Sequence, residues 1–260
     1  MVQTSNISIS LPNSKPTVLS AMAPHAVPPR SGVRAIKKPA KAKAKASQAK
    51  LSSGCLTKLL KVYKGLEDFH LPLFKEVQRI AKAKRVLYPG SHWHLQASVV
   101  FPDVTYVDYN QKVAPFFEDP AVLAWIKQNK LYAAEAKMKF CLNDFEHLKL
   151  PGGFDLLISM SAGIVSKPCT RFLRIGGYFL VSDAHFDART VALDKRFALL
   201  GVYDMKSKKL DTKDLKSCFV TSTGQKITAE QVEVSAKKPK GSRGFKLLRE
   251  DWFYLFKRIK

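Results

Sequence analysis

The stretch from Lys84 to Asn110 constrains the fold of this chain most strongly. An apolar run at residues 86–88 stops at Pro89-Gly90-Ser91, and a second run, rich in β-branched residues, covers residues 104–107 and ends at Asp108. Buried runs of this length, separated by a turn and a short connection, predict a strand, a turn, a crossover and a second strand. The stretch therefore indicates an α/β fold with parallel strands.

A glycine turn after one buried strand and an acid at the tip of the next are typical of doubly wound proteins that hold a nucleoside. Gly90 would let the backbone approach the ligand, and Asp108 would accept hydrogen bonds from ribose hydroxyls. Asp108 follows Gly90 by 18 residues, near the roughly 20 of that pairing. Only one glycine of the dinucleotide pattern is present and there is no GxxxxGK[ST] phosphate loop, which disfavours NAD, FAD and nucleoside triphosphates.

The segments VLYPGS, FPDVTYVD and FDLLISMSAG resemble class I S-adenosylmethionine-dependent methyltransferases and are similar to uncharacterised bacterial members of that superfamily. The resemblance implies a three-layer, Rossmann-like α/β sheet, mostly parallel, with an antiparallel C-terminal strand. The chain departs from the family pattern in its first motif. Tyr88 stands where the family usually has an acid, and His92 and His94 stand where it has further glycines.

The resemblance also implies S-adenosylmethionine as cofactor, with Gly90 and Ser91 at its methionine end, Asp108 on the ribose and Asp144 near the adenine. Ser159 joins these candidate cofactor-binding residues because it ends a strong strand, where open α/β sheets bind ligands. Each has a plainer interpretation. Asp144 could cap the turn that follows it, and serine hydroxyls at strand ends often cap helices.

Asp183 and His185 are the candidate catalytic residues. They stand two residues apart at the end of a predicted strand, where a carboxylate and an imidazole could serve as acid and base for the methyl acceptor. A histidine near a strand end can equally be a satisfied structural residue. No Asn-Pro-Pro-aromatic acceptor motif follows the preceding strand, so the acceptor is left open.

The sequence predicts no metal site. His92 and His94 have the spacing of metal ligands, but no third donor stands near them in the sequence. Both imidazoles and Trp93 would then fill space above the sheet edge. A Ser-His-Asp hydrolase is disfavoured as well, because no GxSxG motif is present.

Hydrophobic periodicity and turn residues give the remaining elements. Helices are expected over residues 56–63, from Pro72 to Ala81, after the Asp119-Pro120 cap, and from Lys167-Pro168 to Leu173. Strands are expected over residues 139–142, 154–160, 178–181 (after a Gly176-Gly177 turn), 197–203 and 252–256. Residues 204–249 are interpreted as a polar excursion with short strand-like pieces at 218–221 and 232–234.

Charge divides the chain at about residue 50. The formal net charge is +23, and residues 1–50 contain nine lysines or arginines but no acid. Such a segment buries too little apolar surface to offset the entropy of ordering it, so it is predicted to be a disordered tail before one domain over residues 51–260. The tail resembles both an organelle transit peptide and a nuclear or nucleic-acid-binding tail, and it could also be a solvated linker.

The remaining composition indicates a soluble intracellular protein. The four cysteines are widely spaced and form no CxxC pair, and no apolar run reaches the roughly 18 residues that span a bilayer. Two functions are therefore carried forward: an S-adenosylmethionine-binding methyltransferase of unknown acceptor, and a non-catalytic module that binds nucleic acid or another polyanion through its lysines.

Overall fold

The computed structural model describes residues 52–238 and 244–260. The predicted disordered tail, residues 1–50, lies outside the described residues, as do the targeting signals considered for it. Within the described part, no helix combines the length and the apolar character needed to cross a membrane. All four cysteines are free, as expected.

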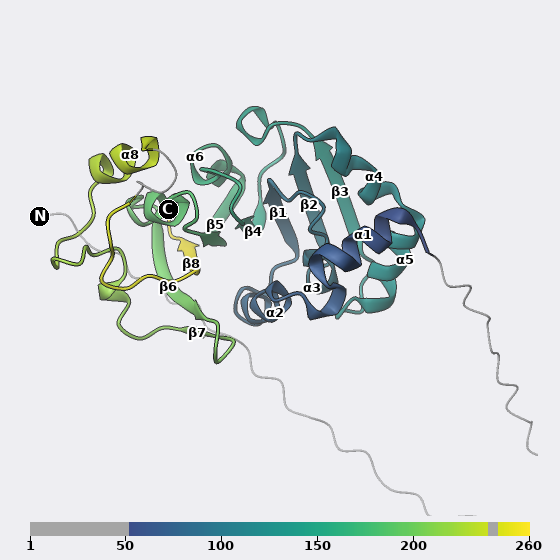
Figure 1. The fold of residues 1–260 in the computed structure, drawn as a ribbon, viewed down its shortest axis with the longest axis horizontal. Coiled ribbons are helices and arrows are strands. Elements are labelled where there is room, and N and C mark those ends of the chain that lie inside the picture. The colour runs from purple at the N-terminus through teal and green to yellow at the C-terminus, as the bar shows by residue number, and fades with distance from the viewer. Residues whose placement is uncertain (1–51, 239–243) are drawn as a thin grey trace, which may run out of the picture. The chain divides into compact units, whose positions relative to one another are not determined.

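One sheet carries the fold, and its eight described strands lie in the order β3-β2-β1-β4-β5-β8-β6-β7 (Figure 1). Strands β1 to β5 are mutually parallel, whereas β8 lies antiparallel between β5 and β6. This confirms the predicted mostly parallel sheet with a reversed C-terminal strand. The strands are β1 Arg85–Pro89, β2 Asp103–Asp108, β3 Lys137–Leu142, β4 Phe154–Ser159, β5 Leu173–Ser182, β6 Phe197–Asp204, β7 Lys209–Asp211 and β8 Phe253–Arg258.

Helices cover both faces of this sheet. The α-helices are α1 Gly54–Tyr63, α2 His70–Ala81, α3 Ala97–Val100, α4 Ala114–Glu118, α5 Pro120–Asn129, α6 Ser166–Cys169, α7 Asp187–Ala192 and α8 Ala229–Lys237. Short 3-10 turns lie at η1 Gly65–Glu67, η2 Gln111–Val113, η3 Phe145–His147, η4 Thr170–Phe172 and η5 Leu215–Ser217.

The central strand β1 shows why the protein has three layers. Val86 and Tyr88 pack into a core that also contains residues of α1 to α5, whereas Leu87 points to the other face and packs with residues of α6, α7 and α8. All three side chains are buried. A parallel strand covered on both faces needs apolar residues at successive positions, which is the pattern that the sequence has here.

Side chains cap two helix N-termini, and the one at Asp119 was predicted. The Asp119 carboxylate accepts hydrogen bonds from the backbone N–H groups of Ala121 and Val122, at 2.9 and 3.0 Å. Ser53 caps α1 through Leu56 N and donates its hydroxyl to Asp119 at 2.9 Å. Because the two caps are bonded to each other, the start of α1 is fixed to the start of α5.

The predicted turn at Gly176-Gly177 was wrong. Strand β5 runs through both glycines, and its pairing with β4 shifts register between Phe154 and Leu156. Gly176 has a φ of 79°, which glycine adopts without strain. The glycines therefore make a bulge inside a long strand.

Two further predictions fail for local reasons. The helix opened by Lys167-Pro168 ends at Cys169, and a 3-10 turn connects it to β5. Residues 232–234, expected to be strand-like, belong to α8, because Thr228 and Gln231 form a reciprocal capping box that starts a helix just before them. Residues 218–221 form only isolated bridges.

The edge strand β7 is attached to α2 by the buried carboxylate of Glu76. Glu76 accepts the backbone N–H of Leu210 at 3.2 Å and lies 3.6 Å from the ammonium of Lys209. Arg79 also donates two hydrogen bonds to it, both at 2.9 Å. The hydrogen bond from Arg79 is the main reason that the pKa of Glu76 falls from 4.5 to about 2, and burial opposes it.

We expect Glu76→Gln to reduce the pH dependence of stability in acid. A depressed carboxyl pKa adds stability that is fully present above pH 4.5 and is lost as the pH falls towards 2. Urea unfolding of the wild type should therefore lose more free energy across this interval than that of the variant. Glu118→Gln, at an exposed position of α4, is the matched control and should behave as the wild type does. Equal losses in Glu76→Gln and wild type would contradict the expectation.

Candidate active site

A cavity of about 760 Å³ opens where β1, β4 and β5 end and β8 begins. In an open parallel sheet, the crevice beyond the carboxyl ends of the strands is the usual ligand site, and this volume is in the range of small-molecule pockets. The side chains and backbone on its wall include Tyr63, Phe69, His70, Tyr88, Gly90, Ser91, His92, His94, Met160, Ser161, Ser182, Asp183, Arg189, Glu250, Trp252 and Phe253.

Gly90 and Ser91, both predicted to bind the cofactor, lie on this wall. The backbone N–H of Gly90 donates to Val107 O at 2.7 Å, so the turn is tied to the neighbouring strand. Gly90 has a φ of 62°, and a Cβ there would come within 2.2 Å of the Ala162 Cβ. The glycine is therefore required by its close approach to the loop after β4.

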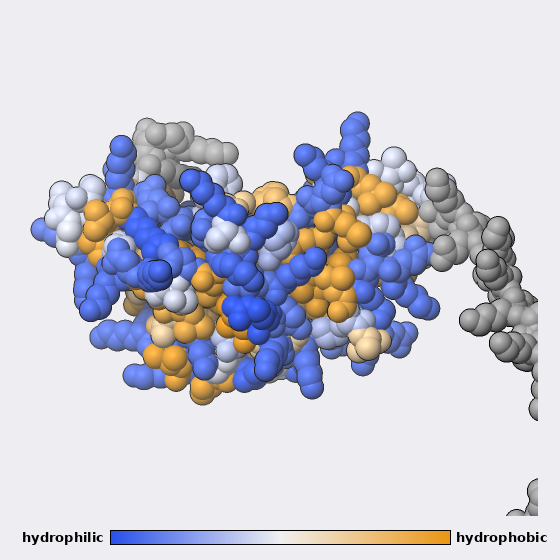
Figure 2. Space-filling model, turned by 90° about the horizontal axis from the view of Figure 1, so that it is seen from below, coloured by the Kyte–Doolittle hydropathy of each residue, from blue (hydrophilic) through white to orange (hydrophobic). Residues whose placement is uncertain are grey.

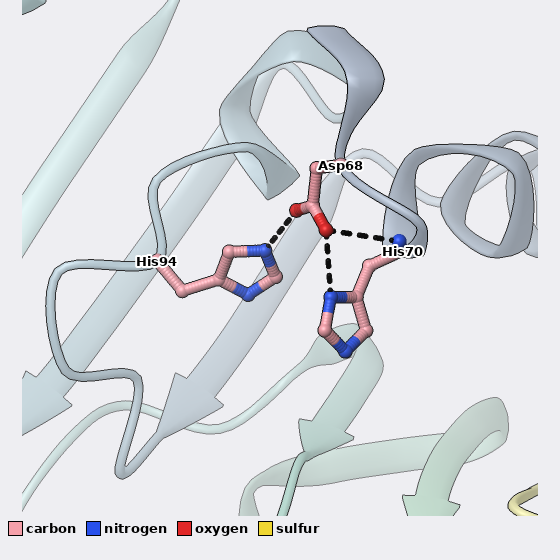
Figure 3. A group of neighbouring side chains, drawn as sticks. All are labelled: Asp68, His70 and His94. Carbon is pink, nitrogen blue, oxygen red and sulfur yellow. Dashed lines mark hydrogen bonds and ion pairs between the residues drawn. The ribbon is translucent and has the colours of Figure 1, made fainter. Parts of the chain in front are cut away.

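A buried carboxylate, which the sequence analysis did not single out, joins two histidines at the cavity (Figure 3). Asp68 lies between η1 and α2, and its Oδ1 is 2.9 Å from His70 Nδ1 and 3.1 Å from the His70 backbone N. Its Oδ2 is 2.5 Å from His94 Nε2. The hydroxyl of Tyr88, in β1, is 2.9 Å from His94 Nδ1. The network thus joins three separate segments of the chain.

The hydrogen bonds assign the donor and acceptor roles of the rings. The Asp68 carboxylate accepts, so His94 donates from Nε2, and its Nδ1 accepts from the buried Tyr88 hydroxyl, whose one partner among the described residues it is. His70 likewise donates to Asp68 from Nδ1. Its Nε2 has no hydrogen-bond partner among the described residues, and the ring lines the cavity.

Burial and hydrogen bonding set the protonation states of the network. Burial alone would raise the pKa of Asp68, but the hydrogen bonds from His70 and His94 outweigh it and hold that pKa well below its usual range. Burial lowers the pKa of His94, against the opposing effect of Asp68. At neutral pH the cluster is therefore a carboxylate with a neutral His94 imidazole.

Asp108, the predicted ribose ligand, lies outside the cavity wall. Its Oδ2 accepts the backbone N–H of His92 at 2.8 Å, and its Oδ1 accepts that of Asn110 at 2.9 Å. The side chains of Tyr63 and His92 do line the cavity and are hydrogen-bonded to each other at 3.2 Å. Burial, followed by the charges of Asp68 and Asp108, raises the pKa of Tyr63 to about 12. Two cavity residues are therefore linked to Asp108: His92 through its backbone N–H, and Tyr63 through the effect of the Asp108 charge on its pKa.

The loop from His92 to Gln96 contains no glycine, but its first residue has a backbone conformation that is typical of glycine. His92 has a φ of 50°, in the left-handed region. The Trp93 ring stacks on Phe116 with ring centroids 4.6 Å apart, but its buried indole N–H has no partner among the described residues. The same holds for both amide atoms of the buried Gln96. Buried polar atoms without partners cost free energy, so these groups destabilise the loop.

Asp144 and Ser159 also lie away from the cavity wall. Asp144 accepts the backbone N–H of Glu146 at 2.9 Å and caps η3, which is the plainer of its two interpretations. Ser159 donates its hydroxyl to Asp187 at 2.8 Å, and both residues are buried. Asp187 accepts two backbone N–H groups of the loop after β4 as well, so Ser159 takes part in holding that loop.

The structure separates the two predicted catalytic residues. Asp183 lies on the cavity wall and forms an ion pair with Arg189, whose Nε is 2.7 Å from it. Burial raises the pKa of Asp183, although Arg189 acts in the opposite direction. His185 is turned away from the wall, with Nε2 3.1 Å from Ser161 O.

Asp68 and His70 are the site residues that the sequence analysis missed. They are 26 and 24 residues from His94, so their approach depends on how the start of α2 packs against the loop after β1 and was not visible as a motif. The one local signal was a carboxylate and an imidazole two residues apart, just before Pro72. Of the pair His92 and His94, only His94 belongs to the cluster, and its two partners come from the turn before α2 and from the first residue of that helix.

No protein family and no curated protein sequence matches the chain. Several solved structures are similar to it at low identity. A putative O-methyltransferase from Klebsiella pneumoniae is 13% identical with a TM-score of 0.40, covering 57% of this chain and 82% of its own. The O-methyltransferase TomG from Streptomyces achromogenes, in complex with SAM, is 10% identical with a TM-score of 0.42, covering 81% and 92%. The Bacillus cereus O-methyltransferase in complex with SAH is 11% identical with a TM-score of 0.39, covering 57% and 83%.

The strand order decides the fold class, because the last strand returns antiparallel between β5 and β6 of an otherwise parallel series. The chain has a class I methyltransferase-like fold. In this methyltransferase-like sheet the cavity lies above β1 and β4, where the strand order changes direction from one half of the sheet to the other.

We expect Gly90→Ala to lower the free energy of unfolding by roughly 2–4 kcal/mol, because overpacking costs about 1–3 kcal/mol and a left-handed backbone about 1 kcal/mol more. The double variant Gly90→Ala/Ala162→Gly removes the contact between the two Cβ atoms and should recover more than about half of that loss. Gly54→Ala, where a Cβ meets nothing within 4 Å, is the control. Denaturant unfolding measures all three, and a double variant no more stable than Gly90→Ala would refute the packing argument.

Proposed function

We propose that the protein is an S-adenosylmethionine-dependent methyltransferase whose cofactor and acceptor share the cavity above β1, β4 and β5. The observation that carries the proposal is the position of that cavity: about 760 Å³ at the carboxyl edge of a methyltransferase-like sheet, with Gly90 and Ser91 on its wall. The volume suits a nucleoside-sized ligand with a small acceptor beside it.

Charges on the wall support binding of the amino-acid end of the cofactor. Arg189 supplies a buried guanidinium, and Asp183 and Glu250 supply carboxylates close to it, at 2.7 and 3.6 Å. A zwitterionic ammonium and carboxylate can be paired by such a mixed set. Since Arg189 also holds the backbone O of Phe245 at 3.0 Å, this part of the wall is rigid.

The nucleoside end fits less directly. A carboxylate offers about four acceptor positions, and Asp108 uses one on each oxygen for backbone N–H groups. It therefore retains capacity for ribose hydroxyls, but the cavity reaches Tyr63 and His92 and stops short of the carboxylate itself. In this proposal, ribose binding at Asp108 requires these two side chains to move.

Bound in the cavity, the cofactor would supply an electrophilic methyl group on a sulfonium sulfur. The task of the chain is then mainly to hold the acceptor in line and to exclude water. Phe69 and Trp252 are on the wall and largely exposed, so they offer apolar surface to an acceptor at the mouth. Asp183 serves better to orient Arg189 than to take a proton, because its oxygens are already bonded to it.

Isothermal titration calorimetry with S-adenosylmethionine and S-adenosylhomocysteine tests the proposal. We expect saturable binding with a stoichiometry of one per chain, and an increase in melting temperature with ligand concentration, since a ligand that binds only the folded state stabilises it. An absence of binding by both ligands would refute the proposal.

A pair of variants tests how the nucleoside is held. His92→Ala shortens one of the two side chains between the cavity and Asp108 in this proposal and should tighten S-adenosylhomocysteine binding, because less has to move. Asp108→Asn in the same background should cancel the gain and weaken binding roughly tenfold, as expected for one lost charged hydrogen bond. His185→Ala, outside the cavity wall, is the control. Binding that is indifferent to both substitutions would place the ribose elsewhere.

Polyanion binding is the second candidate, and the charge of the chain favours it. The chain has 44 lysines and arginines against 21 acids, and hydrophilic side chains project over much of the face seen in Figure 2. If this is the function, affinity for a single-stranded RNA should fall steeply between 50 and 200 mM salt, by a factor of about 300 for six phosphate contacts, and Asp108→Asn should not change it. Fluorescence anisotropy measures this, and affinity that is flat across the salt series would exclude the second candidate.

A further inference from the structure

Asp68, His70 and His94 bring together three potential metal-ligand atoms at the cavity, one carboxylate oxygen and two imidazole nitrogens, all within 4.8 Å of one another. They come from the turn before α2, the first residue of α2 and the loop after β1 (Figure 3). Two of the three, His70 and His94, are on the cavity wall. The cluster is thus enclosed on the side of Asp68 and open on the other.

The donor set is selective for particular ions. Two neutral imidazoles and one carboxylate suit Zn²⁺ and neighbouring transition metals, whereas Mg²⁺ and Ca²⁺ prefer oxygen ligands throughout. Three protein ligands with one position left open are the usual composition of a catalytic zinc site, while structural zinc sites take four. The burial of Asp68 makes the carboxylate a strong partner for a cation, because little solvent screens it.

The residue behind His94 completes the arrangement. Metal-bound histidines are generally oriented by a hydrogen bond at their second nitrogen, and His94 Nδ1 lies 2.9 Å from the buried Tyr88 hydroxyl. In the network described above the two ring protons point at Asp68. An ion would take their place, and each proton would move to the other nitrogen of its ring: to Nδ1 of His94 and to Nε2 of His70, towards the cavity. The Tyr88 hydroxyl would then rotate and accept the hydrogen bond from His94 Nδ1 instead of donating it.

We propose that Asp68, His70 and His94 bind one divalent transition metal ion, with Zn²⁺ as the best match, and leave a coordination position open to the cavity. The open position would take water or an oxygen of a ligand, and the ion would act there as a Lewis acid. The proposal does not depend on methyl transfer, because any ligand of the cavity would meet the same ion. It departs from the prediction of no metal site, because His94 takes Asp68 and His70 as its partners rather than His92.

Metal titration of the full chain tests this. The protein is treated with EDTA and dialysed, then titrated with Zn²⁺ against a chromophoric chelator and, separately, with Co²⁺ while its visible absorption is followed. We expect one ion per chain, a Co²⁺ spectrum of low coordination number, and a rise in melting temperature with Zn²⁺. Wild-type protein that binds less than one equivalent at micromolar Zn²⁺ would overturn the proposal, whatever the variants do.

Variants locate the ion. His70→Ala and His94→Ala should each weaken Zn²⁺ binding by at least about 100-fold, and Tyr88→Phe by roughly 10–100-fold as an outer partner. His92→Ala is the matched control, because His92 lies in the same loop as His94, lines the same cavity and should leave the affinity unchanged. Circular dichroism confirms that each variant is folded. If His70→Ala folds and binds Zn²⁺ as the wild type does, or if His92→Ala is as damaging as His94→Ala, the assigned ligand set is wrong.

Discussion

The buried carboxylate of Asp68 is the interaction on which the candidate site depends. It accepts hydrogen bonds from both histidines and from the backbone at the start of α2, so it fixes that helix to the loop after β1. A buried charge of this kind is tolerable only when several donors surround it. Removing any of these donors would leave the carboxylate less satisfied, and removing the carboxylate would free two imidazoles at once. The position of one wall of the cavity therefore follows from this single group.

Other carboxylates along the carboxyl edge of the sheet hold loops in the same way. Asp108 holds the loop after β1 by accepting the backbone N–H of His92. Asp187 holds the loop after β4 by accepting two backbone N–H groups and the Ser159 hydroxyl. Asp183, directly after β5, pairs with Arg189 in α7. In a chain with 44 basic and 21 acidic residues, these few acids are placed where loops must be kept in one conformation. Backbone N–H groups that would otherwise be unpaired at the strand ends are satisfied in this way.

These carboxylate contacts hold the turn after β1 in place, although Gly90 is the one glycine of the family pattern that is present there. Gly90 remains because the Ala162 Cβ leaves no room for a side chain. His92 adopts a left-handed backbone that a glycine would adopt more easily, and the bond from its N–H to Asp108 stabilises it there. The consequence is a histidine ring on the cavity wall and a second histidine, His94, within reach of Asp68. A histidine where the family pattern has a glycine, His94, thus contributes one of the three polar side chains of the cluster with Asp68 and His70.

By itself the sequence determined the class of fold. Its evidence consisted of local or periodic patterns: the apolar runs of β1 and β2, the Asp119-Pro120 cap and the aromatic C-terminal strand. Such patterns can be recognised without knowing which elements pack beside them. It misplaced elements where pairing or capping partners mattered, at Gly176-Gly177 and in α8. Only the tertiary structure decided which polar residues share the cavity. Asp68, His70 and His94 meet because the start of α2 packs against the loop after β1. Asp108, Asp144 and Ser159 bond to backbone or neighbouring partners that no spacing in the sequence reveals. Side-chain direction at a strand end depends on which donor lies within about 3 Å, and that distance is set by packing between distant segments.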